Sequence, residues 1–531
     1  MNPIQQEPET LDRQNRLVNL LAEAERSRRP HSGVELIETH ISWILLAGRF
    51  AYKIKKAVHL DFIDASDLEV RRFFCEEELR LNRRLAPRLY LDVVPIGGSE
   101  DAPELERSPA LEYAVRMSRF DTADEMDRMV LNGTLLAQHI DSLAVTLARF
   151  HRNLPAAAEG VRYGNPSDVY VCASQNLAQV RALLPEAEPV LAGLEQNTET
   201  AFARNKNNFS RRCTEGFVRE CHGDLHLANI VVMDGEAVPF DGIDFDPALR
   251  WIDVIADMAF PFMDLLHYER PGLAYRLINR YLEESGDYGA MGMFLFHASA
   301  RAVVRAKVYA IRTSQQKPDS HERSRFAAVS LNYISLAAVL LVKTRPFLVI
   351  THGLPGSGKS TFAQAALERF GAIRIRSDIE RKRLFGLSAL DVSHSQPVDI
   401  YSTEATERTY RALRRIAHEL LSAGFSVIVD AAFLRQAERR LFREMAEKEH
   451  VPFAIASVLA GEALLRKRIL ERMSKADDPS EANLDVLAVL QTAGEALTSS
   501  ERSRLAEFHN DAENGFAADD PGWKSLDDLL A

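Results

Sequence analysis

Apolar and polar residues alternate in two different ways along the first part of the chain. Residues 35–56 alternate as two strands joined around Ala47 and Gly48, which predicts a hairpin. Residues 67–86 instead repeat apolar positions every three or four residues, which is typical of a helix. A further strand is expected at 112–120. Together these segments predict a small α+β lobe over about residues 30–120.

The pattern changes twice further along. Long helical patterns dominate residues 130–340 and indicate a helical lobe. Pro346 then ends the helical pattern, and the apolar run FLVI begins at once. Strand and helix patterns alternate after it, which favours a parallel sheet with crossover helices. We therefore expect two domains, an α+β domain at 1–342 and an α/β domain at 346–531.

Composition narrows the class of protein. A chain of 531 residues is long for a single core, which agrees with two domains. The net charge of −11 argues against a broad nucleic-acid surface. The four cysteines form no CxxC pair, so neither a disulfide framework nor a zinc site is indicated. With no targeting segment and no apolar run near the roughly 20 residues that span a bilayer, we expect a cytoplasmic protein without membrane contact.

The motif GLPGSGKS begins the second domain. It matches G-x-x-x-x-G-K-[ST] in full, with an apolar strand before it and a helix after it, as a phosphate-binding loop requires. Backbone amides would turn toward the phosphates, the lysine would reach the outer phosphates, and Ser360 would ligate Mg²⁺. The expected nucleotide-binding residues are Gly353, Gly356, Ser357, Gly358, Lys359, Ser360 and Thr361.

Two further aspartates follow strands of this domain. Asp378 comes directly after the second strand with Arg381 one turn further on, and another strand ends in Asp430. With the phosphate loop, this arrangement resembles the polynucleotide-kinase and zeta-toxin branch of small P-loop kinases. The resemblance implies that Asp378 activates the accepting hydroxyl, that Arg381 places the substrate, that Lys359 takes part in transfer and that Asp430 ligates Mg²⁺.

A helix near residue 470 carries several arginines. Arg466, Arg468 and Arg472 lie where a lid would sit in the resembling fold, and the last two share a helical face. A solvated, salt-bridged helix and a lid that brings arginine to the nucleotide are both consistent with this pattern. Arg468 and Arg472 are accordingly nucleotide-binding candidates.

The segment HGDLHLAN marks a second candidate site, in the first domain. Asn229 follows Asp224 by five residues, the spacing of a kinase catalytic loop. This form of the loop resembles the aminoglycoside phosphotransferase and choline kinase branch of the kinase-like fold. The resemblance implies that Asp224 is the base and that Asn229 and Asp244 ligate Mg²⁺, with Asp241 a competing candidate.

The small lobe should supply the lysine that binds phosphate. Lys53 and Lys55 point to the same face of one strand, and Lys53 is preferred. Its expected partner is Glu78, with Glu77 and Glu76 left open by helical spacing. No G-x-G-x-x-G precedes the lysines, which weakens the expectation of tight nucleotide binding.

A basic helix face at 300–312 is a candidate acceptor site. Arg301 and Arg305 lie near one helical face, and in the resembling family the late helices form the acceptor pocket. A solvated face explains the pattern equally well. The sharper hypothesis is an acceptor that carries a carboxylate or a phosphate.

The sequence as a whole resembles bacterial bifunctional proteins that fuse an aminoglycoside phosphotransferase-like half to a P-loop kinase-like half. We expect an ATP- and Mg²⁺-dependent phosphotransferase that acts on hydroxyl groups of small, sugar-like or nucleoside-like molecules. A nucleotide-sensing regulatory protein with one inactive half is the alternative of another class. A 5′-hydroxyl nucleic-acid kinase in the second half is a third hypothesis, favoured by its locally basic segments and opposed by the net charge. The acceptor, the choice between ATP and GTP, and the oligomeric state stay open.

Overall fold

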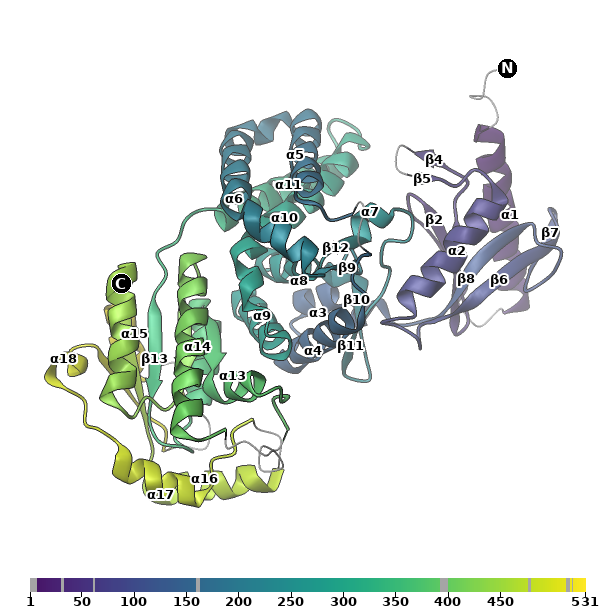
Figure 1. Ribbon diagram of the computed structural model, residues 1–531. Helices are drawn as coiled ribbons and strands as arrows, with labels where there is room; N and C mark the ends of the chain where they lie inside the picture. Colours follow the sequence, from purple (N-terminus) through teal and green to yellow (C-terminus); the bar gives the residue numbers. More distant parts are fainter. Residues whose placement is uncertain are drawn as a thin grey trace. The chain divides into compact units, whose positions relative to one another are not determined.

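The structure is a computed structural model whose described residues fall into two compact units (Figure 1). The described residues are 7–29, 33–60, 63–158, 163–391, 400–475, 479–511, 516–517 and 519–531. The first unit comprises Met1–Thr146, Phe150–Val169 and Ser210–Asp264, and the second comprises Leu147–Arg149, Tyr170–Phe209 and Leu265–Ala531.

The first unit contains a six-stranded antiparallel sheet with the strand order β1-β2-β3-β8-β6-β7. Its strands are β1 (Glu35–Glu38), β2 (Ser42–Ala47), β3 (Phe50–Lys55), β6 (Tyr90–Ser99), β7 (Ala102–Leu105) and β8 (Glu112–Ser118). The hairpin around Gly48 is present, and the segment 35–56, which alternates like two strands, contains three of them. A tight turn separates β1 from β2, because the backbone and hydroxyl of Thr39 both bond to Ser42.

Two helices cover the two faces of this sheet. Helix α1 (Glu7–Arg28) packs Leu17 and Leu21 into one apolar core of the sheet, and α2 (Leu68–Asn82) packs Cys75 into a core on the other side. The side chain of Asp67 caps α2 by accepting two backbone hydrogen bonds. This cap fixes where α2 begins, and so which of its carboxylates face the sheet.

The remaining elements before residue 342 are mostly helical, as the sequence predicts. The short strands are β4 (His59–Leu60), β5 (Ile63–Asp64), β9 (Val218–Glu220), β10 (Ile230–Met233), β11 (Glu236–Pro239) and β12 (Trp251–Asp253). The helices are α3 (Met126–Asn132), α4 (Ala137–Asn153), α5 (Pro166–Leu183), α6 (Glu188–Thr214), α7 (Pro247–Arg250), α8 (Val254–His267), α9 (Pro271–Ser285), α10 (Met291–Ser314) and α11 (His321–Leu340). One-turn helices lie at Thr122–Asp124, Pro185–Ala187, Leu227–Asn229 and Tyr288–Ala290.

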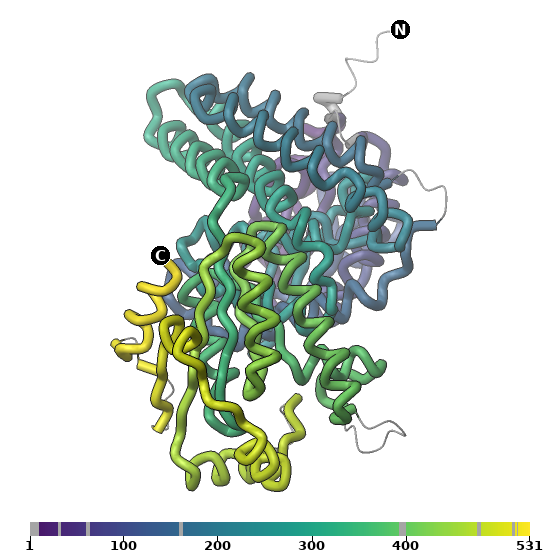
Figure 2. The backbone as a smooth tube through the Cα atoms, turned by 60° about the vertical axis from the view of Figure 1, so that its left-hand side comes forward, coloured from purple at the N-terminus to yellow at the C-terminus, as the bar shows by residue number. Residues whose placement is uncertain are grey.

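The second unit contains a five-stranded, fully parallel sheet with the order β14-β15-β13-β16-β17. Its strands are β13 (Leu348–His352), β14 (Ile373–Arg376), β15 (Val427–Asp430), β16 (Phe453–Leu459) and β17 (Leu505–His509). The helices that follow β13 along the chain are α12 (Lys359–Phe370), α13 (Ser377–Leu384), α14 (Thr403–Ser422), α15 (Gln436–Glu449), α16 (Glu462–Lys475), α17 (Leu484–Ala493), α18 (Ser499–Arg502) and α19 (Pro521–Leu530). Figure 2 shows this part of the chain, green to yellow, from another side.

The core of the parallel sheet forms between α12 and α19. Phe362 and Leu367 from α12 meet Trp523 and Leu526 from α19 over the strands. The predicted fold class is confirmed: an antiparallel lobe with a helical lobe precedes a parallel P-loop sheet. The predicted boundary at 342–346 falls between the end of α11 and the start of β13, while the domain limits themselves remain a prediction.

Hydropathy along the helices bears on membrane contact. Among the described residues, no helix combines the length and the apolar character that a bilayer crossing requires.

Two candidate active sites

The two lysines of β3 converge on one glutamate of α2. Lys53 Nζ lies 2.8 Å from Glu78 Oε1, and Lys55 Nζ lies 2.6 Å from Glu78 Oε2. The alternation of the strand places both lysines on one face, and the buried carboxylate of Glu78 uses one oxygen for each. The structure therefore pairs Glu78 with both candidate lysines rather than with one of them.

The neighbouring glutamates of α2 face other partners. Glu77 bonds Arg80 at 2.7 Å and Arg250 at 2.8 Å, whereas Glu76 pairs with Arg72 at 2.9 Å. Of the three glutamates left open by helical spacing, Glu78 is the one beside the lysines.

Two aspartates complete the lysine cluster, and each takes a different lysine. Lys53 Nζ lies 2.5 Å from Asp241 Oδ1, while Lys55 forms an ion pair with Asp244. The side chain of Asp241 is 44% exposed and that of Asp244 only 7%. Burial raises the pKa of Asp244. Loss of solvent acts on Asp241 too, but the charge and hydrogen bond of Lys53, together with the charges of Lys55 and His222, lower the pKa of Asp241.

Asp241 also adopts an uncommon backbone conformation. Its φ of 61° lies in the left-handed region, and its backbone N–H donates a hydrogen bond of 3.1 Å to the hydroxyl of Tyr90. Such strain in a residue other than glycine persists only when the surroundings impose it, and it gathers at functional sites. Asp241 is thus the accessible, strained carboxylate of the pair.

The segment HGDLHLAN forms the loop between β9 and β10. Asn229 Nδ2 donates to the backbone oxygen of Asp224 at 2.9 Å and to its Oδ2 at 3.3 Å, and His226 Nε2 lies 3.5 Å from the same Oδ2. Gly223 turns the chain with a φ of 87°, and a Cβ there would meet the backbone oxygen of Leu249 at 2.8 Å. The loop therefore presents the partly exposed carboxylate of Asp224 beside Asn229.

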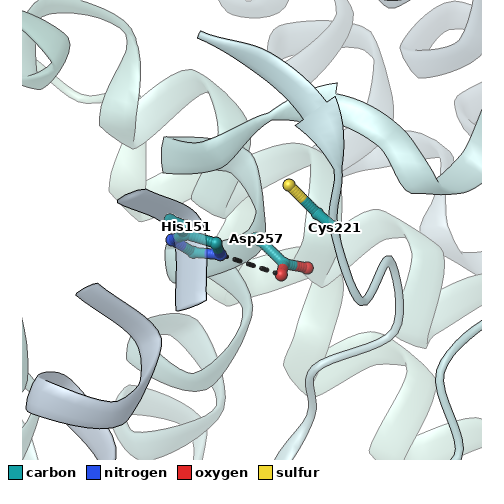
Figure 3. Close-up of side chains that lie close together, drawn as sticks. All are labelled: His151, Cys221 and Asp257. Atoms are coloured by element: carbon teal, nitrogen blue, oxygen red, sulfur yellow. Dashed lines mark hydrogen bonds and ion pairs between the residues drawn. The ribbon is translucent and has the colours of Figure 1, made fainter. Parts of the chain in front are cut away.

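A buried aspartate from α8 holds this loop in place. Asp257 accepts hydrogen bonds from the backbone N–H groups of His222, at 3.1 Å, and Gly223, at 2.9 Å. Figure 3 shows the ring of His151 directed at the same carboxylate, at 3.2 Å, with Cys221 close by. Burial alone would raise the pKa of Asp257, but the hydrogen bond and charge of His151, with the other donors, lower it to about 2.

His151, Cys221 and Asp257 also have the residue types of a metal site. Their ligand atoms lie within 4.8 Å of one another. Asp257 already serves the backbone of the loop, however, and Cys221 Sγ contacts the backbone oxygen of Ile252 at 3.6 Å. The cluster acts as a structural anchor of the loop.

The phosphate-binding loop connects β13 to α12. Gly358 has a φ of 98° and lies so close to Asn510 that a Cβ would collide with its side chain. Lys359, Ser360 and Thr361 form the first turn of α12, where backbone N–H groups point outward. Lys359 Nζ donates to the backbone oxygen of Leu354 at 2.8 Å. Burial, only partly offset by Asp430 and Asp378, lowers the pKa of Lys359 to about 8.

One cavity of about 630 Å³ joins this loop to the other predicted residues of the P-loop half. Of the predicted residues, those that line it are Gly356, Gly358, Lys359, Ser360, Thr361, Asp378, Arg381, Asp430, Arg468 and Arg472. Gly353 and Ser357 belong to the loop without lining the cavity. Among the described residues, Arg381 Nε, Asp430 Oδ2 and Arg472 Nε of this cavity and Ser357 Oγ of the adjoining loop are buried without a hydrogen bond.

The arginines of α16 divide between the cavity and the surface. Arg468 Nη1 lies 3.4 Å from the backbone oxygen of Gly356, and Arg472 donates at 2.6 Å to that of Ala482. Arg466 pairs with Glu462 on the exposed face of the helix. The predicted lid segment continues into residues 476–478, which lie outside the described residues.

Several residues of the cavity were not predicted. Arg376, Tyr401, Thr406 and Glu438 line it, and α17 contributes an apolar wall that includes Val489. A sequence signal existed for Arg376, because two arginines at alternate positions of IRIR are unusual in a buried parallel strand. Thr406, Glu438 and Val489 come from helices far along the chain, and Tyr401 from the turn before α14, in segments whose patterns do not differ from those of ordinary surface segments.

The candidate acceptor arginines lie on α10. Arg305 stacks over the rings of Tyr309, at 5.6 Å, and Tyr333, at 6.0 Å. Arg301 is half-buried on the same helix, and neither arginine lines the P-loop cavity. Their role as acceptor ligands remains a prediction.

Fold and site geometry together define a chain of two kinase-type modules. Residues 72–294 match a family model described as the phosphotransferase enzyme family, and residues 348–497 match one described as an AAA domain. An uncharacterized protein of Mycobacterium tuberculosis (strain ATCC 25618 / H37Rv) is 30% identical over 468 residues, which are 86% of this chain and 89% of the relative. An uncharacterized protein of Mycobacterium bovis matches to the same extent.

The chain belongs to the family of these mycobacterial proteins, with a phosphotransferase domain followed by a P-loop domain. Among solved structures, a choline kinase from Cryptosporidium parvum is 10% identical, with a TM-score of 0.36 over 60% of this chain and 95% of its own. A gluconokinase from Sinorhizobium meliloti is 19% identical, with a TM-score of 0.24 over 35% of this chain and 91% of its own.

Proposed function

We propose that this protein is an ATP- and Mg²⁺-dependent phosphotransferase that acts on hydroxyl groups of small molecules. The observation that carries the proposal is the cavity of about 630 Å³ beside the phosphate-binding loop. It brings Lys359 and Ser360, the carboxylates of Asp378 and Asp430, and several arginines together in one space. Positioning and charge stabilisation are the main tasks of a phosphoryl-transfer site, and these residue types supply both.

The donor atoms around this cavity suit a magnesium nucleotide. Asp430 Oδ2 and Ser357 Oγ are buried without a hydrogen-bond partner, which is costly unless a ligand or ion satisfies them. Carboxylate and hydroxyl oxygens are the ligands that Mg²⁺ prefers. When bound, the ion would neutralise charge on the transferred phosphoryl group, and Ser360 and Asp430 are the residues that would hold it.

Each residue of the cavity has a proposed task in the transfer. Lys359 and the amides at the start of α12 would hold the phosphates. Asp378 would accept the proton of the attacking hydroxyl, since an alcohol needs a base at its proton. Arg468 and Arg472, which line the same space, would stabilise charge on the phosphoryl group.

The other residues that line the cavity indicate which chemical class of acceptor would fit. The wall formed by α17 is apolar, with Val486, Val489 and Leu490 facing the space. In contrast to this apolar wall, Arg381 is charged and buried, and its Nε makes no hydrogen bond. Tyr401 lies beside it. A cavity of about 630 Å³ is of ordinary size for a small ligand. We infer a small acceptor with one apolar face and a polar or anionic group for Arg381.

The N-terminal half is proposed to use a second set of residues for the same chemistry. Asp224 would act as the base, and Lys53, fixed by Glu78, would bind phosphate. The sequence alone favours Asp244 as the metal ligand, but its burial and its ion pair with Lys55 support a structural task. The accessible Asp241 is therefore our candidate to join Asn229, whose amide nitrogen serves Asp224 and leaves Oδ1 for an ion.

One experiment tests both halves. Wild type, Asp224→Ala and Lys359→Ala are incubated with ATP, Mg²⁺ and a pooled metabolite extract, and phosphorylated products are identified by mass spectrometry. A product lost in one variant identifies the active half and its acceptor together. Asp234→Asn is a matched control, because this aspartate is exposed and pairs only at the surface with Arg88.

One result would contradict the proposal that the protein is a phosphotransferase. If the wild type binds ATP at both sites and forms no phosphorylated product, the protein is a nucleotide-responsive regulator and not a phosphotransferase. For the N-terminal acceptor, unchanged affinity and turnover in Arg305→Ala would remove the hypothesis of an anionic acceptor at α10.

A further inference from the structure

Helix α9 covers the open edge of the parallel sheet. Among the described strands β14 is an outer one, so the backbone groups on its outer side meet no described strand. Asn279, which is 1% exposed, meets two of them: its Nδ2 donates to the backbone oxygen of Ala372 at 2.9 Å, and its Oδ1 accepts from the N–H of Arg374 at 2.6 Å. One amide side chain thus replaces the missing strand at this point.

A buried carboxylate lies one helical turn further along α9. Glu283, 2% exposed, accepts from Arg374 Nε at 3.0 Å and from Arg374 Nη2 at 2.6 Å. Its second oxygen lies 3.9 Å from Arg376 Nη1 and 3.5 Å from Arg280 Nη1. Arg374 and Arg376 are two residues apart on β14 and so reach the same carboxylate from one face of the strand.

Both arginines also reach the phosphate-binding site. Arg374 Nη1 donates to the backbone oxygen of Ser360 at 3.3 Å. Arg376 lines the cavity, and its Nε lies 3.7 Å from Asp430 Oδ2, the same oxygen that makes no hydrogen bond. Arg376 therefore stands within 4 Å of two carboxylates, Glu283 and Asp430.

The position of Arg376 matters because Asp430 is the proposed ligand of Mg²⁺. A guanidinium that moved fully onto Asp430 would compete with the cation for the same oxygen. Glu283 supplies an opposing attraction at comparable distance, and in a buried setting such forces are only weakly screened. Removing the charge of Glu283 would shift this balance toward Asp430.

We propose that Glu283 is a positioning residue of the P-loop site, which holds Arg374 and Arg376 on the side of α9 and so leaves Asp430 available to Mg²⁺. The inference rests on the proposed function, in which Asp430 ligates the ion. Glu283 belongs to the region that matches the phosphotransferase family, whereas both arginines and Asp430 belong to the region that matches the AAA domain. The second site is thus completed by a residue of the first family region.

The test measures Mg²⁺-dependent ATP binding rather than turnover. ATP binding to the full chain is titrated by calorimetry at a series of Mg²⁺ concentrations, and the part that is absent in Lys359→Ala is assigned to the P-loop site. Glu283→Gln should raise the Mg²⁺ concentration for half-maximal binding on the order of fivefold or more. Glu284→Gln is the matched control, because its carboxylate pairs with Arg280 at 2.8 Å, whereas Glu283 holds Arg374 at 2.6 Å.

A double variant separates positioning from simple damage. If Glu283 acts through Arg376, then Glu283→Gln combined with Arg376→Gln should return the Mg²⁺ requirement toward that of the wild type. Should Glu283→Gln fail to fold, Glu283→Asp keeps the charge but withdraws it from the arginines, and an increase in the Mg²⁺ requirement is again expected.

Two outcomes overturn the inference in distinguishable ways. Equal Mg²⁺ requirements in the folded Glu283 and Glu284 variants, or no recovery in the double variant, would exclude the positioning role alone. A wild type without any ATP binding that depends on Lys359 would instead overturn the proposed function and the inference with it.

Discussion

The role of Asp257 as the anchor of the HGDLHLAN loop can be tested directly with the variant Asp257→Asn. The carboxylate of Asp257 accepts from two backbone N–H groups and from His151, all in a fully buried setting. An asparagine keeps one acceptor oxygen and replaces the other by a donor, which then faces an N–H donor. At least one backbone group of the loop would lose its partner.

The expected loss can be estimated in two ways. The pKa of Asp257 is lowered from 3.8 to about 2, and at 1.36 kcal/mol for each unit this corresponds to about 2 kcal/mol of stability. Counting one lost hydrogen bond to a charged group, at about 1.5–3 kcal/mol, leads to the same range. Because the folded pKa lies below the unfolded one, this stabilisation is present above pH 4 and disappears as the pH falls toward 2.

Hydrogen exchange resolved by mass spectrometry is the assay of choice, since a chain with two units need not unfold in one step. A loss of about 2 kcal/mol should speed exchange of the amides at 220–225 by about thirtyfold. Exchange at 348–360 serves as an internal reference. Asp234→Asn should leave both segments unchanged, because Asp234 is an exposed surface residue.

Two results would refute the reasoning about Asp257. One is unchanged exchange at 220–225 in the variant, which would mean that the loop is held by other contacts. The other is an equal loss of stability in wild type and variant between pH 4 and pH 2.5, which would mean that Asp257 does not titrate with the lowered pKa.

Further predictions concern the sheet edge and the lysine cluster. Asn279→Ala should lower the free energy of unfolding by about 2–3 kcal/mol, measured by urea denaturation, because two buried backbone groups lose their partner. Lys55→Met should cost about 3 kcal/mol of stability, since it leaves the buried Asp244 unpaired. Lys53→Met should be milder, because the exposed Asp241 can be hydrated, and should mainly weaken ATP binding in a calorimetric titration.

Comparison with matched variants distinguishes the predicted effects from a general loss of stability. Asn205 donates to the backbone oxygen of Ala201 within its own helix, so Asn205→Ala should cost less than Asn279→Ala. Equal losses for the two asparagines would contradict the role of the sheet edge. A larger loss of stability in Lys53→Met than in Lys55→Met would contradict the assignment of the structural pair.

Much of the fold can be predicted from the spacing of apolar residues and from the residues that begin and end helices and strands. The helix that begins after Asp67 and the parallel strands around the phosphate loop have patterns that local physics explains. The strands β6 and β7 were not predicted individually, because YLDVVPIGGSEDAPEL mixes proline and glycine into an irregular alternation. The extra strand β1 depends on a side-chain turn at Thr39 that no apolar pattern reports.

The residues of the candidate sites likewise divide into those that the sequence predicts and those that it does not. The loop residues Asp224 and Asn229 follow from spacing, since five residues of sequence fix their neighbourhood. The choice between Asp241 and Asp244 does not follow from spacing. It depends on how exposed each side chain is, and only tertiary packing determines that exposure. Glu283 has no sequence signal at all, because its partner Arg374 lies 91 residues away.

The cover that α9 places over β14 has a consequence for how the chain is made. An outer strand with free backbone groups is a template on which other chains can aggregate. During synthesis α9 leaves the ribosome well before β14, so the side chain of Asn279 is present when the sheet edge first forms. The order of the two halves in the chain therefore protects the nascent protein. If the order were reversed, β14 would be synthesised before α9, and the sheet edge could self-associate until α9 had been made.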